Sequence, residues 1–120
     1  MRSLKPDDYT ESWAQCRGFY ERALVHEPFF AIPLLVIDWA IARGITNDLY
    51  VWRSHDWLVI SNRRWEAERA DRLIVIPKPD SVELRLYHDA ALTQRADIDQ
   101  SGLVEELDRL VSGFGRATGS

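Results

Sequence analysis

Residues 28–44 read Pro-Phe-Phe-Ala-Ile-Pro-Leu-Leu-Val-Ile-Asp-Trp-Ala-Ile-Ala-Arg-Gly, and this segment constrains how the rest of the chain is arranged. It predicts a helix over 32–43, with Pro33 in the first turn and Gly44 at the C-terminal end, where a left-handed residue is favoured. Because the segment is apolar on nearly every side, other parts of the protein must cover it. A helix over 29–43 would be only about 22 Å long, shorter than the roughly 30 Å hydrocarbon core of a bilayer. It also contains Asp38, so we expect a buried helix rather than a membrane span.

Asp38 is the only acidic residue of this helix, and the helical wheel places it on a narrow strip of small residues. The strip consists of Ala31, Asp38 and Ala42. The broad, core-facing side is built on Val36, Ile37 and Trp39. Because an unpaired buried carboxylate is costly, we favour an exposed Asp38 over a buried functional acid. The wheel leaves open whether the strip meets water, a pocket or another subunit.

The rest of the chain adds two helices and four strands to this central helix. A capping-box pattern of Asp8 with Glu11 begins the first helix, and leucines at helical spacing define the last one. These helices are expected over 8–25 and 102–112. Runs rich in aromatic and branched residues, separated by polar turns, predict two β-hairpins. Their strands are expected over 49–53, 57–61, 73–76 and 82–88. The connection over 63–72 fits a short helix, a loop or an extra strand.

The strand register of the first predicted hairpin depends on the length of its turn. A four-residue loop over 53–56 makes Trp52 and Trp57 direct cross-strand neighbours, a pairing that stabilises a hairpin by about 0.2 to 1 kcal/mol. A two-residue loop is disfavoured, because a type I′ turn prefers Asn-Gly to the His55-Asp56 found here. We therefore expect the longer loop.

The order α-α-β-β-β-β-α predicts an α+β fold, in which an antiparallel four-stranded meander sheet is packed by two N-terminal helices and one C-terminal helix. With 120 residues, 46% of them hydrophobic, the chain fits a single domain over 1–120, and 113–120 form a flexible tail. Unbroken apolar runs in the central strands indicate that both faces of the sheet are covered there. The sequence does not show what covers the second face.

Net charge and cysteine content indicate which partners and which cellular compartment suit this chain. A net charge of -4 argues against broad binding to nucleic acid or to an anionic membrane, since both need a positive surface. The single cysteine, Cys16, falls on the apolar stripe of the first helix and has no partner for an intramolecular disulfide. The polar opening of the chain does not fit a signal peptide. We expect a cytoplasmic protein with a buried thiol.

Catalytic signatures are weak in this sequence. His88, at the end of the last predicted strand, is the best candidate for general acid-base chemistry, with Asp38 and Arg85 as further polar groups. A structural or surface role is nevertheless favoured for His88, because sequence cannot show whether these side chains converge. The spacings of metal ligands, phosphate-binding loops and nucleophile elbows are all missing, so we expect no metal and no cofactor.

One short basic segment contains an aromatic residue: Arg63, Arg64 and Trp65. This composition suits phosphate contacts and base stacking. Glu66 and Glu68 interleave it, however, and mixed charge of this kind is typical of a solvated connection. A nucleic-acid partner is therefore not expected.

The function that the sequence favours is a non-enzymatic interaction module, such as a small bacterial adaptor, inhibitor or immunity-type protein. Aromatic residues and Arg are enriched in interface cores, and this chain is rich in both. The residues expected at a protein interface, either with another protein or with a second copy, are Leu35, Trp39, Tyr50, Trp52 and Trp57. The alternative is a small enzyme or ligand-binding domain with a pocket between sheet and helices that uses His88, Asp38 and Arg85.

Overall fold

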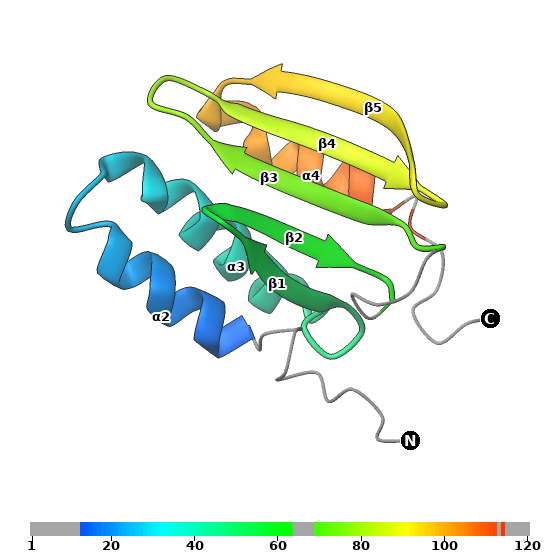
Figure 1. Ribbon diagram of the computed structural model, residues 1–120, viewed down its shortest axis with the longest axis horizontal. Helices are drawn as coiled ribbons and strands as arrows, with labels where there is room; N and C mark the ends of the chain where they lie inside the picture. The colour runs from blue at the N-terminus through cyan, green and yellow to red at the C-terminus, as the bar shows by residue number, and fades with distance from the viewer. Residues whose placement is uncertain (1–12, 64–68, 113, 115–120) are drawn as a thin grey trace.

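The computed structural model describes residues 13–63, 69–112 and 114 of the chain. These residues form two layers, a five-stranded antiparallel sheet and three helices on one of its faces (Figure 1). The strands are ordered β1-β2-β3-β4-β5, so the sheet is a meander. The predicted α+β class, the antiparallel sheet and its three helices are confirmed. The predicted number of four strands is wrong.

The bounds of the elements agree with the predicted ones to within a few residues, apart from the additional strand. The helices are α2 (Trp13–Ala23), α3 (Ala31–Arg43) and α4 (Leu103–Val111), with short 3-10 helices at Pro28–Phe30 and Gln100–Gly102. The strands are β1 (Tyr50–Ser54), β2 (Trp57–Ser61), β3 (Arg72–Pro77), β4 (Val82–His88) and β5 (Ala91–Ile98). The start of the first predicted helix, 8–12, lies outside the described residues. In the predicted tail only Phe114 is described, and it packs against the core. No helix in the described ranges is both long and apolar enough to span a membrane.

α3 packs between α2 and α4, which explains its apolar composition. It ends at Gly44, whose φ of 72° is the left-handed conformation predicted for that glycine. Six of its side chains are buried: Ile32, Pro33, Val36, Ile37, Trp39 and Ala40. Asp38 lies on the exposed side, and its carboxylate forms an ion pair with Arg17 of α2. The predicted exposed strip is therefore present on the outer side of the helical layer.

Asp108 of α4 connects α4 to α3 through hydrogen bonds. The indole N–H of Trp39 donates to Asp108 Oδ1 at 2.8 Å. Arg43 donates to the same carboxylate from Nε at 2.9 Å and from its Nη2 atom at 2.8 Å. The hydrogen bonds from Arg43 and Trp39 lower the pKa of Asp108 to about 2. The Trp39 side chain therefore forms part of the contact between α3 and α4.

The first hairpin turns through two residues, His55 and Asp56, because the β1 and β2 pairing continues up to them. The predicted four-residue loop is wrong. The turn takes an uncommon conformation, with a φ of 59° at His55. The Tyr20 hydroxyl of α2 donates to the Asp56 carbonyl at 3.0 Å. A contact between layers therefore supports a turn that local preference disfavours.

β5 is the strand that the sequence prediction missed. Most of its side chains are exposed, so it lacks the alternating apolar pattern by which strands are recognised. A two-residue turn, Asp89-Ala90, joins it to β4, and these residues have φ values of 56° and 73°. Positive φ at both positions is the geometry of a type I′ turn, but the Asn-Gly signal is missing.

Replacing Ala90 with glycine is expected to stabilise the protein by about 0.5 to 1 kcal/mol. The left-handed conformation is strained for alanine and free of strain for glycine, and this gain exceeds the extra entropy of glycine in the unfolded chain. Urea denaturation measures the difference. Ala96→Gly in β5 is the matched control and should destabilise the protein, because its φ is not positive. Equal destabilisation by both substitutions would contradict the assigned turn.

Candidate interaction face

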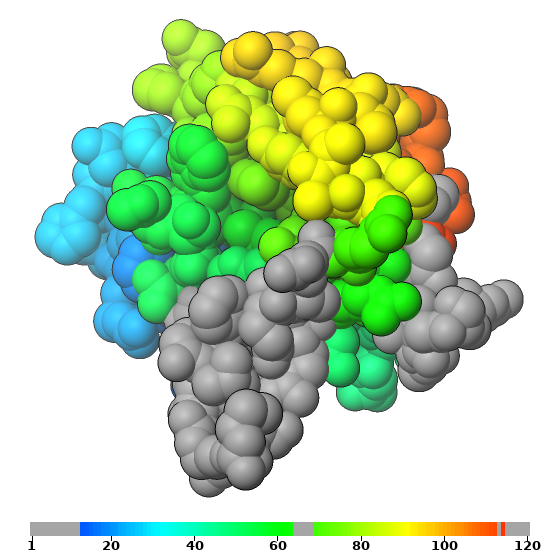
Figure 2. Space-filling view, turned by 45° about the vertical axis from the view of Figure 1, so that its right-hand side comes forward, coloured from blue at the N-terminus to red at the C-terminus, as the bar shows by residue number. Residues whose placement is uncertain are grey.

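The sheet has one face covered by α2, α3 and α4 and one face turned away from them (Figure 1). We call the second one the exposed sheet face and define its members by strand register, since residues directly opposite each other share a face. Its large or charged side chains are Tyr50, Trp52, Trp57, Val59, Arg72, Ile74, Ile76, Glu83, Arg85, Tyr87, Leu92, Arg95 and Asp97. Figure 2 shows part of the exposed sheet face. The green residues of β1 and β2 lie towards the left, and the yellow residues of the β4–β5 end lie towards the upper right.

Two tryptophans of the β1–β2 hairpin lie on this face, and each is paired with an arginine of the β3–β4 hairpin. The Arg72 guanidinium lies 5.0 Å from the centre of the Trp52 ring, and the Arg85 guanidinium lies 5.1 Å from that of Trp57. Trp52 and Trp57 are diagonal neighbours across β1 and β2, because Trp52 is opposite Val59. Both indoles are half-buried, so part of each is accessible. The result is a compact block of alternating aromatic and cationic groups.

The middle of the face is apolar and closely packed. Val59 and Ile76 belong to it by register, yet they are only 3% and 6% exposed. Val59 has Trp52 and Ile74 as its direct partners on the two neighbouring strands. The expectation that the central strands are covered on both faces therefore holds for these two residues.

A buried carboxylate organises the charged part of the face. Glu83 is only 2% exposed. Its carboxylate forms ion pairs with three cations: Lys78 Nζ at 3.0 Å, Arg85 Nε at 2.5 Å and Arg95 Nε at 2.8 Å. Burial by itself raises the pKa of Glu83, but the hydrogen bonds from these three cations outweigh burial and lower it to about 2. Glu83 is thus ionised, and it holds Arg85 in its place over Trp57.

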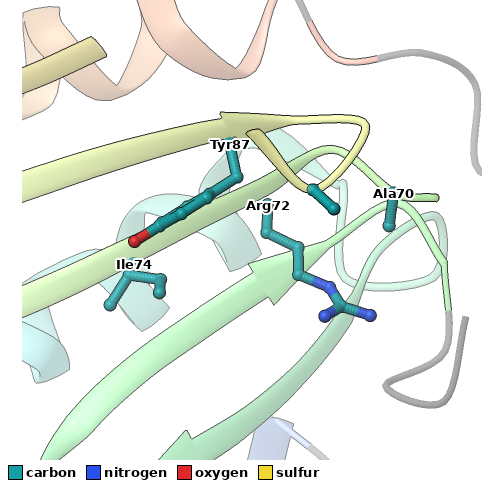
Figure 3. Close-up of a pocket in the computed structure, with 5 residues that line it drawn as sticks. Ala70, Arg72, Ile74 and Tyr87 are labelled. Atoms are coloured by element: carbon teal, nitrogen blue, oxygen red, sulfur yellow. The ribbon is translucent and has the colours of Figure 1, made fainter. Parts of the chain in front are cut away.

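A pocket of about 240 Å³ opens at one end of the exposed sheet face, lined by Ala70, Arg72, Ile74, Tyr87 and Ala90. Figure 3 shows the Tyr87 ring reaching along the sheet towards Ile74, while Arg72 extends towards the Ala70 end. The walls are largely apolar, with a guanidinium and a phenol at the rim. Pockets for drug-sized ligands are usually about 300 to 1,000 Å³, so this one suits a single side chain or a very small molecule.

The three catalytic candidates do not come together. Asp38 lies on the helical layer with Arg17, and Arg85 lies on the exposed sheet face with Glu83. His88 is one residue beyond Tyr87, so strand alternation directs it to the opposite face. The geometry provides no common pocket for Asp38, Arg85 and His88. In the part of the chain that the structure describes, no group of three or more His, Cys, Asp or Glu side chains is placed to hold a metal ion.

His88 has a partner that sequence reasoning missed. Its Nδ1 atom lies 2.6 Å from Oδ1 of Asp71, a buried residue just before β3. The Asp71 backbone is fixed by Asn62, whose side-chain oxygen accepts from the Asp71 N–H at 2.9 Å. Asp71 belongs to a connection with no clear periodicity, so nothing in the sequence indicated its burial. The imidazole thereby fastens the end of β4 to the start of β3.

The residues predicted for an interface fall into two groups. Tyr50, Trp52 and Trp57 lie together on the exposed sheet face. Trp39 is buried against α4 and is not available to a partner, whereas Leu35 is exposed on α3, on the other layer of the molecule. Sequence reasoning missed the contribution of Arg72, Ile74 and Tyr87, since their neighbours depend on strand register. Arg63 is exposed after β2, and Arg64 and Trp65 lie outside the described residues.

The chain matches no protein-family model. No curated protein sequence and no solved structure shows significant similarity to it.

Proposed function

We propose that this protein is a non-enzymatic interaction module that binds an acidic, partly apolar segment of a partner protein on its exposed sheet face. The observation that carries the proposal is the pairing of Trp52 and Trp57 with arginines beside a small apolar pocket. Trp, Tyr and Arg are the residues most enriched at binding hot spots. The tryptophans supply contact area, and the pocket accepts one apolar side chain of the partner.

Charge favours a partner that carries carboxylates. The face has three arginines, with Lys78 at its border, against the two carboxylates of Glu83 and Asp97. Positive charge is thus in excess locally, although the whole chain has a net charge of -4. Complementary charge speeds encounter and selects among partners more than it adds affinity. An acidic segment is therefore the best match to this surface.

The same composition could suggest single-stranded nucleic acid, but the geometry favours protein. One side of each indole, on Trp52 and on Trp57, is already occupied by a guanidinium, and a stacking base would have to compete with it. The net negative charge of the chain further opposes a polyanion. A catalytic pocket built on His88, Asp38 and Arg85 is not proposed, because these residues lie apart.

The role most consistent with this surface is that of a small adaptor, inhibitor or immunity-type protein. Such proteins act by occupying a partner and need no cofactor. We place the protein in the cytoplasm, where the thiol of the buried Cys16 would stay reduced.

Selection from a displayed library of random linear peptides tests the proposal. Bound sequences should be enriched in Asp and Glu next to aromatic or branched residues, and their affinity should fall at high salt as charges are screened. A fluorescent single-stranded oligonucleotide serves as the competing probe and should not bind. Enrichment of basic peptides, or oligonucleotide binding without peptide binding, would contradict the proposal.

A further inference from the structure

β5 is an edge strand whose outer side meets no other described element. It pairs with β4 on one side and lies at the opposite edge of the sheet from β1 (Figure 1). Among the described residues, backbone hydrogen bonds of β5 are made only within its pairing with β4. An edge of this kind presents unpaired N–H and C=O groups to another strand.

We propose that β5 pairs with β5 of a second copy of the chain, in antiparallel orientation about a twofold axis at Ala96. A twofold axis perpendicular to the sheet turns the same face of both copies to the same side. Opposed residues must therefore share a face, so only every second register is allowed. With Ala96 on the axis, Arg95 of each copy lies directly opposite Asp97 of the other.

Charge selects this register from its neighbours. Moving the axis to Arg95 places the two arginines opposite each other, and moving it to Asp97 places the two aspartates opposite each other. Like charges directly opposite each other are destabilising. An axis at Gln94 puts Arg95 opposite Thr93, so no cross-strand ion pair forms. Within residues 94–98, the register centred on Ala96 is thus favoured by two ion pairs that the adjacent registers lack.

The two charged side chains are available for these contacts. Arg95 and Asp97 are 60% and 50% exposed, although each already has a partner within its own copy. Arg95 donates a hydrogen bond to Glu83, and Asp97 accepts one from Lys78, so both charged groups stay on the exposed sheet face. Charges on an edge strand usually prevent pairing with unrelated strands. Here the same charges disfavour pairing with unrelated strands, but they are complementary to those of β5 in a second copy.

The pairing would be short. The register shift opposite Leu86 and Tyr87 interrupts the ladder near Thr93, which leaves the segment 94–98 for regular pairing. In this segment Gln94 would lie opposite Ile98 on the helical side. The dimer would join the two five-stranded sheets into one and place two exposed sheet faces side by side.

Sedimentation of the full chain at increasing concentration tests this inference. The wild-type protein should form a concentration-dependent dimer that weakens with salt. Arg95→Glu and Asp97→Lys each place like charges opposite each other, and each should raise the dissociation constant about tenfold or more. An equimolar mixture of the two variants should dimerise again, because both cross-strand pairs then have opposite charges. Recovery in the mixture also shows that both variants are folded.

A control lies near the other end of the strand. Ala91→Glu changes charge outside the paired segment and should leave the dimer unchanged. A wild-type protein that stays monomeric at every concentration would overturn the inference. Equal dimerisation of the wild type and both variants, or failure of the mixture to recover association that the wild type shows, would overturn it as well. Trp57→Ala should not affect dimerisation, so this test is independent of partner binding on the exposed sheet face.

Discussion

Replacing Glu83 with glutamine is expected to lower the free energy of unfolding by about 2 kcal/mol at neutral pH. The substitution keeps the shape of the side chain but leaves the cations of Lys78, Arg85 and Arg95 without their shared carboxylate. Removing one partner from a fully buried ion pair costs about 3 to 5 kcal/mol. The smaller value is expected here because the three cations are themselves partly exposed and can regain water.

The pH dependence follows from the lowered pKa of Glu83. In the folded protein this carboxyl has a pKa of about 2, whereas its ordinary value is 4.5. A lowered pKa contributes stability that is complete above the unfolded-state value and is lost as the pH falls from there towards 2. Denaturation of the wild-type and Glu83→Gln proteins should therefore give a difference that narrows steadily through this range.

Asp97→Asn is the matched control for Glu83→Gln. Asp97 shares the Lys78 ammonium but is half-exposed, so its removal should change stability little when denaturation is measured on the dilute, monomeric protein. If the difference between the wild type and Glu83→Gln stayed constant down to the acid limit, the carboxylate would not be the source of the stabilisation.

Trp57→Ala is expected to weaken the binding of a selected acidic peptide by about thirtyfold, the loss typical of a central hot-spot residue. The substitution removes the indole beneath Arg85, one of the two tryptophan rings of the exposed sheet face. Calorimetric titration gives the affinity, and urea denaturation should show a loss of only about 1 kcal/mol, because Trp57 is half-buried on the face away from the main core.

Val104 supplies the control for that measurement. It is an exposed apolar residue of α4, on the helical layer, so Val104→Ala should leave peptide affinity unchanged. Equal weakening by both substitutions, or no weakening by Trp57→Ala, would place the peptide elsewhere on the molecule.

The helices were predictable because their signals are local. Apolar periodicity and Gly44 define α3 to within one residue of its observed bounds. The same wheel correctly placed Asp38 outside the core. What local pattern could not provide was the role of Trp39, since its partner, Asp108, is 69 residues away in the sequence.

The strands show where local signals fail. β5 has no alternating apolar residues, because most of its side chains are exposed, and its turn lacks the glycine that positive φ favours. The two-residue turn at His55 is supported by Tyr20 from another layer. In both hairpins, pairing and contacts elsewhere in the molecule outweigh turn preference.

The candidate site was only partly predictable for the same reason. Tyr50, Trp52 and Trp57 stand out in the sequence as large aromatic residues on strands. Their association with Arg72 and Arg85 depends on the register between hairpins, which no local pattern specifies. Register likewise separates His88 from Arg85 and unites it with Asp71.

Chemical-shift mapping of the protein with a selected acidic peptide locates the binding surface directly. The largest changes are expected on the exposed sheet face: the indole N–H signals of Trp52 and Trp57 and the amides around Arg72 and Tyr87. The outer side of α3, at Leu35 and Asp38, should be unchanged. Changes concentrated on α3 and α4, with the two indoles unaffected, would contradict the assignment of the exposed sheet face as the binding surface.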